Sequence, residues 1–403
     1  MRYLRLLQKA FPRFRRLWHF YWQLIPVTQP FKINVDQTEL DDLKDRMLST
    51  RWMDAISATN WKYGMALSYM KELATYWAND FDWRKTEARI NAIPNFIAEI
   101  DGYRIHYLHI KSRYPDAIPL IISHGWPGSF LEMLNIIPGL TDSGTRSFDL
   151  VIPSLLGFGF SDKPEKEGIN SSLMADLWVK LMDGLGYEKF MAQGGDFGAM
   201  ISTRMALRHP DKLIGLHMNY IPFNYKPYIP SGERLTKEET DAQQATYKFF
   251  QAEGAYAQIQ TTKPLTLSYG LNDSPVGLCS WILQIFHSFS DPNAELEYIF
   301  DRDELLSHVT LYWVTRSIHS SMRLYSEIAK EPLDFGEHDF IKIPVGIAHY
   351  PYPASFPSRK YVERGYNVQY WKDMPVGGHF AAMEQPKLFA GDIKEFSKVI
   401  LQL

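Results

Sequence analysis

The order of strand-like and helix-like segments is the feature that most constrains how this chain folds. Compact apolar runs at residues 119–123, 148–153 and 189–193 are separated by segments with helical spacing, which predicts a mostly parallel sheet with right-handed crossovers. The alternation stops between residues 221 and 335, where the sequence is mostly helical, and sheet character returns at 341–348. We therefore expect an α/β fold with a helical cap inserted above the carboxyl ends of the strands, where ligands bind.

The segments before the sheet are predicted to be helical and then hairpin-like. Leu40, Leu43 and Met47 follow helical spacing. Residues 96–110 are predicted to form two short strands joined by a turn at 101–102. The predicted organisation is a basic amphipathic arm (1–30), an N-terminal helical meander (31–94), a first core part (95–220), the cap (221–335) and a second core part (336–403).

Composition and cysteine content argue against several classes of function. The 403 residues, 45% of them hydrophobic, suffice for one large core and an accessory domain. A net charge of -3 argues against nucleic acid as a partner. The single cysteine, Cys279, excludes an internal disulfide and lies in an apolar run that predicts a buried, inert thiol in a reducing compartment. Neither metal-ligand spacing nor a Gly-rich phosphate loop occurs, so we expect no metal and no cofactor.

The arm at residues 1–30 differs from the rest of the chain in charge. It carries six basic side chains and no acidic one, interspersed with leucines and aromatic residues. No run approaches the ~18 consecutive apolar residues that span a bilayer. We expect an intracellular protein that is cytoplasmic or peripherally attached to a membrane. Contact with an anionic membrane surface, packing on the protein's own cap and, more weakly, mitochondrial targeting are open interpretations of the arm, and a homodimer is also open.

A glycine-rich turn at residues 194–198 holds the candidate nucleophile. The sequence Gly-Gly-Asp-Phe-Gly follows a predicted strand and precedes a predicted helix, as in the elbow that presents the nucleophile of α/β-hydrolases, with Asp196 in place of serine. The backbone N–H of Phe197 and that of Trp126, in the loop after His124, are expected to form an oxyanion hole. A glycine turn capped by an aspartate is the simpler alternative, which the position after a strand disfavours.

An aspartate nucleophile indicates the type of substrate. A carboxylate that attacks an sp³ carbon leaves an alkyl ester, which water can cleave at the acyl carbon, whereas a serine would leave an ether. The electrophile is then an epoxide or an alkyl halide. His379, after the last predicted strand, is the candidate base that deprotonates the water. His124 is predicted to shape the oxyanion loop.

Several motifs together resemble those of the microsomal-type epoxide hydrolases, including the juvenile-hormone and fungal members. They comprise Asn-Asp-Phe-Asp-Trp-Arg at 79–84, Ile-His-Tyr at 105–107, His-Gly-Trp-Pro-Gly-Ser at 124–129, Leu-Asn-Asp-Ser-Pro-Val-Gly at 271–277 and Gly-Gly-His-Phe-Ala-Ala at 377–382. The resemblance implies a hydrolase acting on ether bonds that opens a small apolar epoxide through an aspartyl ester and, with water, gives a diol. It also implies that Tyr256 and Tyr325 in the cap hydrogen-bond the oxirane oxygen, because a leaving alkoxide needs a proton and phenols are protonated at neutral pH.

The chain departs from this family at the residue that orients the catalytic histidine. The family places Asp or Glu after the strand that ends near Ala348, and the corresponding residue here is Pro353. The alternative position used in related enzymes, after the strand near Leu216, holds Asn219, and Glu384 is a family feature rather than a clear substitute. Loss of this carboxylate in a serine triad costs ~10⁴ in rate. We therefore leave the charge-relay acid unassigned and expect slow ester hydrolysis with alkylation preserved.

Other functions stay open beside epoxide hydrolysis. Paired tyrosines without an efficient water step fit an epoxide isomerase or cyclase, and a weakly active binder of hydrophobic ligands is a further alternative. A dehalogenase is disfavoured because Phe197 stands where a halide-binding tryptophan is common. Formation of diol, release of halide, or binding without turnover would distinguish these functions.

Overall fold

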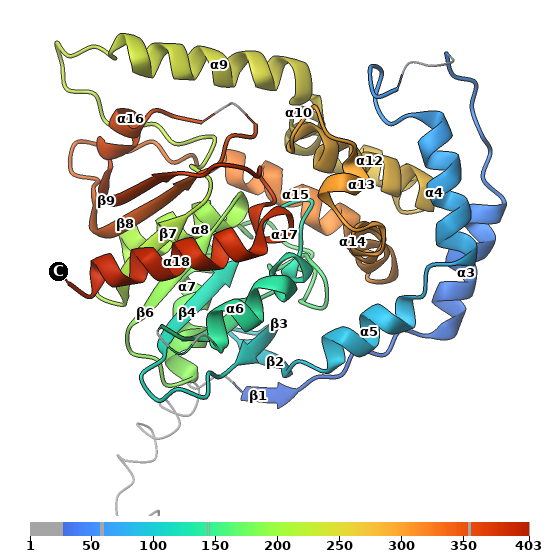
Figure 1. Cartoon of the computed structure of the whole chain (residues 1–403), viewed down its shortest axis with the longest axis horizontal. Coiled ribbons are helices and arrows are strands. Elements are labelled where there is room, and N and C mark those ends of the chain that lie inside the picture. Colours follow the sequence, from blue (N-terminus) through green and yellow to red (C-terminus); the bar gives the residue numbers. More distant parts are fainter. Residues whose placement is uncertain (1–26, 57–59, 143, 145, 354–355, 403) are drawn as a thin grey trace, which may run out of the picture.

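A mixed β-sheet forms the centre of the molecule (Figure 1). The computed structural model describes residues 27–56, 60–142, 144, 146–353 and 356–402. Within them the strand order is β1-β2-β3-β5-β4-β6-β7-β8-β9, with antiparallel pairing from β1 to β5 and parallel pairing from β5 to β9. The strands are β1 (Val27–Pro30), β2 (Asn95–Ile100), β3 (Tyr103–Ile110), β4 (Ile118–Ser123), β5 (Phe148–Pro153), β6 (Phe190–Gly194), β7 (Leu213–Met218), β8 (Ile341–His349) and β9 (Tyr366–Asp373).

The hairpin at the antiparallel edge follows directly from the local sequence. Asp101 and Gly102 have φ values of 53° and 80°, which the two central residues of a tight hairpin turn require. Residues 27–30, which the sequence assigned to the arm, instead form β1 and pair with β2. All four are exposed and lack an apolar alternation, so only their partner strand reveals them.

The central parallel strands, β4 to β7, are buried on both faces, as helices cover each side of the sheet. Ile121 of β4 packs in the cluster that contains α7 (Ser171–Gly184) and α8 (Phe197–Arg208). Its neighbours Leu120 and Ile122 pack in the cluster that contains α6 (Ile137–Thr141) and α18 (Pro386–Ile400). Figure 1 shows α18 and α6 across one face of the sheet. The helices of the core are η1 (Phe130–Ile136), α6 (Ile137–Thr141), α7 (Ser171–Gly184), α8 (Phe197–Arg208), α16 (Arg359–Glu363), α17 (Ala381–Glu384) and α18 (Pro386–Ile400). The predicted α/β fold with a mostly parallel sheet is confirmed.

Helices fill the segment between β7 and β8, as the loss of strand pattern predicted. They are α9 (Lys237–Glu253), α10 (Ala255–Thr262), α11 (Pro264–Leu271), α12 (Pro275–Ser288), α13 (Leu296–Ile299), α14 (Arg302–Val314) and α15 (Ile318–Ala329). In Figure 1, α9 runs along the top of the view and α10–α15 gather beside α17. Cys279 on α12 is fully buried, and burial raises the pKa of its thiol, in agreement with an inert role.

Contacts at both ends hold the cap on the rest of the molecule. Arg364 binds the buried carboxylate of Glu239 at the start of α9, with 2.5 Å between Nε and Oε1. At the other end, the meander helices pack against α12 and α14, where Trp77 donates from Nε1 to Thr310 Oγ1 at 3.0 Å. The meander helices are α3 (Gln37–Leu48), α4 (Leu67–Asn79) and α5 (Trp83–Asn91).

The greater part of the predicted arm, residues 1–26, lies outside the described residues. Membrane contact through the arm and homodimer formation therefore remain predictions. Among the helices that the structure describes, none combines the length and apolar character required to cross a bilayer.

Candidate active site

Asp196 lies between a strand and a helix in a strained backbone conformation. β6 ends at Gly194 and α8 begins at Phe197, and Asp196 has φ 49° and ψ -125°. The flanking glycines are needed because neighbouring backbone atoms leave no room for a Cβ atom, and not only because glycine is flexible. A Cβ at Gly194 would lie 2.2 Å from the carbonyl oxygen of Gly198, and a Cβ at Gly198 would lie 1.9 Å from that of Ser123. This crowding raises the Asp196 side chain above the sheet, as the sequence motif predicted.

The loop after β4 approaches the Asp196 carboxylate closely. The backbone N–H of Trp126 donates to Asp196 Oδ1 at 2.9 Å. Gly125 permits this approach, because a Cβ there would lie 2.2 Å from the same oxygen. Of the two predicted oxyanion-hole donors, the Trp126 N–H therefore binds the Asp196 carboxylate. The Phe197 N–H, the first of α8, has no hydrogen bond to this carboxylate among the contacts of the described residues.

His124, at the base of this loop, is held as a neutral ring. Its Nδ1 lies 3.0 Å from the carbonyl oxygen of Gly125, and its Nε2 accepts from the Leu155 N–H at 3.2 Å. Both bonds fit the tautomer that carries its proton on Nδ1. Burial lowers the pKa of His124 to about 4. The ring therefore fixes the shape of the loop, in agreement with the sequence prediction.

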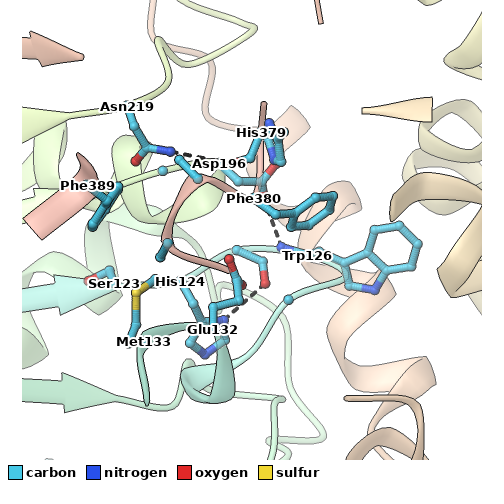
Figure 2. A pocket seen from close by; sticks show the side chains of 15 residues that line it. Ser123, His124, Trp126, Glu132, Met133, Asp196, Asn219, His379, Phe380 and Phe389 are labelled. Carbon is cyan, nitrogen blue, oxygen red and sulfur yellow. Dashed lines mark hydrogen bonds and ion pairs between the residues drawn. The ribbon is translucent and has the colours of Figure 1, made fainter. Parts of the chain in front are cut away.

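His379 faces Asp196 from the loop between β9 and α17 (Figure 2). Its Nε2 lies 3.4 Å from Asp196 Oδ2, and the side chain is 5% exposed. The backbone N–H of His379 donates to the carbonyl oxygen of Phe289 at 3.1 Å, and Tyr220 packs edge-on to its ring at 4.9 Å. The structure thus brings the candidate nucleophile and the candidate base within reach of one water molecule.

The opposite nitrogen of the same ring has no orienting group in the part of the chain that the structure describes. His379 Nδ1 is buried and has no hydrogen-bond partner among the described residues. Glu384 accepts instead from the backbone N–H of Phe380 at 2.9 Å, and Asn219 donates to the backbone carbonyl of His379 at 3.4 Å. Both side chains hold the loop that carries the histidine rather than its ring. Pro353, which occupies the family position, has no acidic group with which to orient the imidazole.

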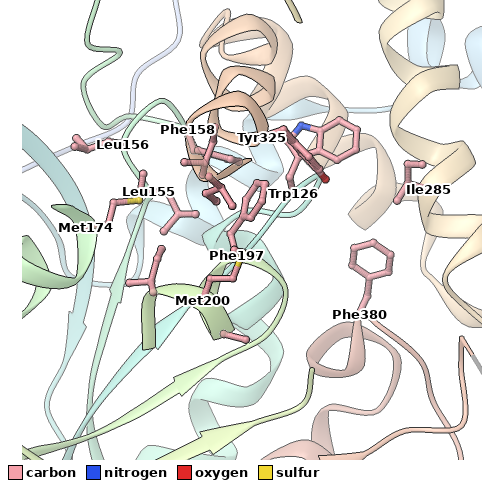
Figure 3. Packing of buried hydrophobic residues seen from close by; sticks show 14 of the residues in the cluster. Trp126, Leu155, Leu156, Phe158, Met174, Phe197, Met200, Ile285, Tyr325 and Phe380 are labelled. Atoms are coloured by element: carbon pink, nitrogen blue, oxygen red, sulfur yellow. The ribbon is translucent and has the colours of Figure 1, made fainter. Parts of the chain in front are cut away.

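Tyr256 on α10 and Tyr325 on α15 meet above the nucleophile. The ring of Tyr256 stacks on Trp126 at 5.5 Å. The ring of Tyr325 packs edge-on against Phe197 at 4.8 Å, and Figure 3 shows these two residues beside Trp126. The two phenol rings lie 6.0 Å apart. Burial raises the pKa of both phenols, and the charge of Asp196 raises it further. Both groups therefore stay protonated at neutral pH and can act as hydrogen-bond donors.

Glu132 is a residue of this site that the sequence reasoning missed. It lies on η1 and lines the same pocket as Asp196 and His379. The Ser-x-x-Glu spacing at residues 129–132 is the sequence signature of a capping box and predicts a local role only. Its proximity to the nucleophile results from how the oxyanion loop folds back on η1.

Comparison with known proteins places this site in a family. Residues 28–133 match the family model described as epoxide hydrolase N terminus, and residues 118–223 match the alpha/beta hydrolase fold. Epoxide hydrolase 1 of Sus scrofa is 36% identical over 405 residues, covering 93% of this chain and 89% of that protein. The chain belongs to the epoxide hydrolase family. It is accordingly a hydrolase acting on ether bonds.

Other epoxide hydrolases share most of the chain. Juvenile hormone epoxide hydrolase 1 of Ctenocephalides felis is 34% identical over 393 residues, with 91% of this chain and 84% of that protein covered. The structure of juvenile hormone epoxide hydrolase from Bombyx mori matches with a TM-score of 0.82 at 29% identity, covering 94% of this chain and 95% of that one. The Aspergillus niger epoxide hydrolase matches with a TM-score of 0.80, also at 29% identity, over 93% and 97% of the two chains. The similarity therefore includes the meander and the cap as well as the core.

The side chains of the described residues are not grouped as metal ligands. In that part of the chain, no group of three or more His, Cys, Asp or Glu side chains is arranged to hold a metal ion. The expectation that the protein uses neither a metal nor a cofactor stays a prediction.

Proposed function

We propose that this epoxide hydrolase opens an apolar epoxide through an ester on Asp196 and releases it as a diol by water attack. The observation that carries the proposal is the position of the Asp196 carboxylate, which contacts the Trp126 N–H at 2.9 Å and faces His379 Nε2 at 3.4 Å. Two protonated phenols, Tyr256 and Tyr325, lie on the cap side of this carboxylate.

In the alkylation step, one carboxylate oxygen of Asp196 attacks a ring carbon of the epoxide. The new bond is a C–O ester bond, and the ring C–O bond breaks with its electron pair on oxygen. Tyr256 or Tyr325 transfers its proton to this oxygen, which leaves a hydroxyl group on the substrate and a phenolate on the enzyme. Two phenols in contact suit this step because the second can donate a hydrogen bond to the phenolate of the first.

In the hydrolysis step, His379 Nε2 takes a proton from water as the water oxygen bonds to the acyl carbon of Asp196. The N–H of Trp126, with that of Phe197, binds the resulting oxyanion. The ester C–O bond then breaks, and the departing alkoxide takes the proton from His379 to complete the diol. The Asp196 carboxylic acid finally returns its proton to the phenolate, which restores the starting state.

The lining of the site on the cap side supports an apolar substrate. Trp126, Tyr256 and Phe289 form a continuous aromatic contact above the nucleophile. Phe289 also packs on the His379 ring at 5.2 Å. Buried aromatic surface of this kind contributes binding energy to hydrocarbon groups and excludes water from the alkylation step.

A second candidate function is supported by the orphaned Nδ1 of His379. Without a carboxylate, the imidazolium formed during water attack is poorly stabilised, while the alkylation step does not use it. An epoxide isomerase or cyclase, or a weakly active binder of hydrophobic ligands, would retain Tyr256 and Tyr325 and need no efficient water step. The relative rate of the second half-reaction decides between these functions.

A single-turnover experiment with apolar epoxides tests the proposal. Enzyme in excess is mixed with each epoxide and quenched in acid, and diol and intact protein mass are measured together. We expect an adduct whose mass equals that of the epoxide, which decays into diol, and which is absent in Asp196→Asn. His379→Gln should form the adduct and retain it. An isomerised epoxide without an adduct would support the second candidate, and binding with neither product would support the binder.

A further inference from the structure

The active-site pocket contains a second buried carboxyl group that the reaction described above does not use. Glu132 is 8% exposed and lines the pocket together with Asp196 and His379. Figure 2 shows it beside His124, on the η1 side of the pocket. The free space within this pocket is about what a single water molecule requires.

The oxyanion loop is shaped around this carboxyl group. If Gly128 had a Cβ, that atom would lie 1.5 Å from Glu132 Oε1 and 2.5 Å from its carboxyl carbon. The carboxyl of Glu132 therefore occupies the space that a side chain at position 128 would fill. Its Oε1 accepts from the backbone N–H of Ser129 at 3.1 Å, which completes a capping box with the Ser129 hydroxyl. This bond uses one carboxyl oxygen.

A capping role alone does not require a carboxyl group in this environment. A glutamine serves equally well at that position of a capping box. The apolar side chains of Met133, Ala381 and Phe389 also line this pocket. Burial and, to a smaller extent, the charge of Asp196 raise the pKa of Glu132 to about 8. The group is therefore a neutral acid at pH 7, with an O–H that can donate a hydrogen bond.

We propose that Glu132 is a positioning residue for the second half-reaction, in which its carboxyl group holds water in the pocket for attack on the Asp196 ester. This inference rests on the proposed function. It gives the water a partner other than His379, whose own Nδ1 has no orienting group among the residues that the structure describes. A neutral acid is suited to this role because a second carboxylate would repel electron density that builds on the oxyanion during attack.

The test compares three variants in the same single-turnover assay. Glu132→Leu removes the polar group at similar volume, and Glu132→Gln keeps one donor and one acceptor. Ser129→Ala removes the hydroxyl half of the capping box and keeps the Ser129 N–H that binds the Glu132 carboxyl group. We expect Glu132→Leu to slow decay of the ester about 10- to 100-fold and to change its formation by less than about threefold. Glu132→Gln and Ser129→Ala should both stay within about threefold of the native enzyme in each step.

The pH dependence of ester decay gives a second measurement that a purely structural role would not produce. Asp196, His124 and His379 line the same pocket as Glu132, Tyr312 lies close enough for the Glu132 charge to raise its pKa, and His308 contacts Ser129. Burial lowers the pKa of His124 to about 4 and that of His308 to about 3, and it raises that of Tyr312 well above its usual value. Ionisation of Glu132 removes its donor, so ester decay should fall as pH rises toward 8, because the ester lacks the Asp196 charge that helps to raise the pKa of Glu132 to about 8 in the free enzyme. Glu132→Gln should abolish this fall.

Distinct results overturn this inference and the proposed function. The role of Glu132 is overturned if ester decay is unchanged in Glu132→Leu. It is also overturned if Ser129→Ala or Glu132→Gln slows ester decay as much as Glu132→Leu does. In each of these cases, an adduct on Asp196 still supports the proposed mechanism. The role of Glu132 is likewise overturned if the rate of ester decay in Glu132→Gln still falls at high pH. This measurement can be made even if Glu132→Leu fails to fold. Absence of both adduct and diol in the native enzyme overturns the mechanism and the inference together.

Discussion

Substitution of Pro353 by glutamate should accelerate hydrolysis of the Asp196 ester. Pro353 occupies the position at which related enzymes carry the orienting acid, and Nδ1 of His379 is buried without a partner in the described residues. A carboxylate that reaches Nδ1 would fix the tautomer with the proton on Nδ1 and stabilise the imidazolium that forms as water attacks. The alkylation step does not involve His379 as a base and should change little.

The size of this effect has an upper limit and an offset. Loss of the orienting carboxylate costs ~10⁴ in a serine triad, which corresponds to about 5.4 kcal/mol at 1.36 kcal/mol per tenfold change. A new carboxylate near a His379 side chain that is 5% exposed also pays for the loss of its hydration. We therefore expect Pro353→Glu to accelerate ester decay by about 10- to 1000-fold rather than by the full amount.

Rapid quench of a single turnover measures both steps separately, with the adduct followed by intact mass and the diol by chromatography. Pro353→Gln is the matched control, because it has the size of glutamate without the charge. Asn219→Asp places a carboxylate at the second position that related enzymes use and provides an independent comparison. Equal acceleration in Pro353→Gln, or a native ester that already decays faster than it forms, would refute the reasoning.

The contacts of the site and the cap give three further predictions. Tyr256→Phe and Tyr325→Phe should each slow adduct formation, measured by intact mass, about 10- to 100-fold. The double variant should nearly abolish adduct formation, and an unchanged rate in it would show that the phenols take no part in the mechanism. Gly125→Ala should reduce adduct formation at least about 100-fold with the far-ultraviolet spectrum preserved, because its Cβ would lie 2.2 Å from Asp196 Oδ1; near-native rates would contradict this. The hydrogen bond from Arg364 lowers the pKa of Glu239 from 4.5 to about 2, so the stability it contributes, about 3 kcal/mol, is present above pH 4.5 and lost as pH falls toward 2. Urea unfolding should show a weaker loss of stability in acid for a Glu239→Gln variant than for the native protein, and parallel curves would exclude this linkage.

The parts of the fold that the sequence predicted are those set by local patterns. The β2–β3 hairpin depends on Asp101-Gly102, and the elbow depends on glycines whose absent Cβ atoms leave room for Asp196. The edge strand β1 was missed because its residues are exposed and become a strand only through pairing with β2. No local pattern distinguishes such a segment from an arm.

The candidate site shows the same division between local and long-range information. The motifs predicted Asp196 and His379, which the structure places 3.4 Å apart, but their roles remain predictions until turnover is measured. Pro353 indicated a missing acid, yet only the fold shows that Glu384 and Asn219 bind backbone groups instead. Glu132 could not be found from sequence, because its approach to the site depends on the path of a loop.

The way the cap is fastened has a consequence for the timing of each catalytic cycle. Arg364 secures α9 at one end, and the meander packs on α12 and α14 at the other. α10 and α15, which contact each other, carry Tyr256 and Tyr325. If the substrate enters between these two helices, the two phenols separate while it enters. We therefore expect Tyr256 and Tyr325 to come together only after the cap has closed over the substrate. An epoxide would then not be activated while bulk solvent can still reach it.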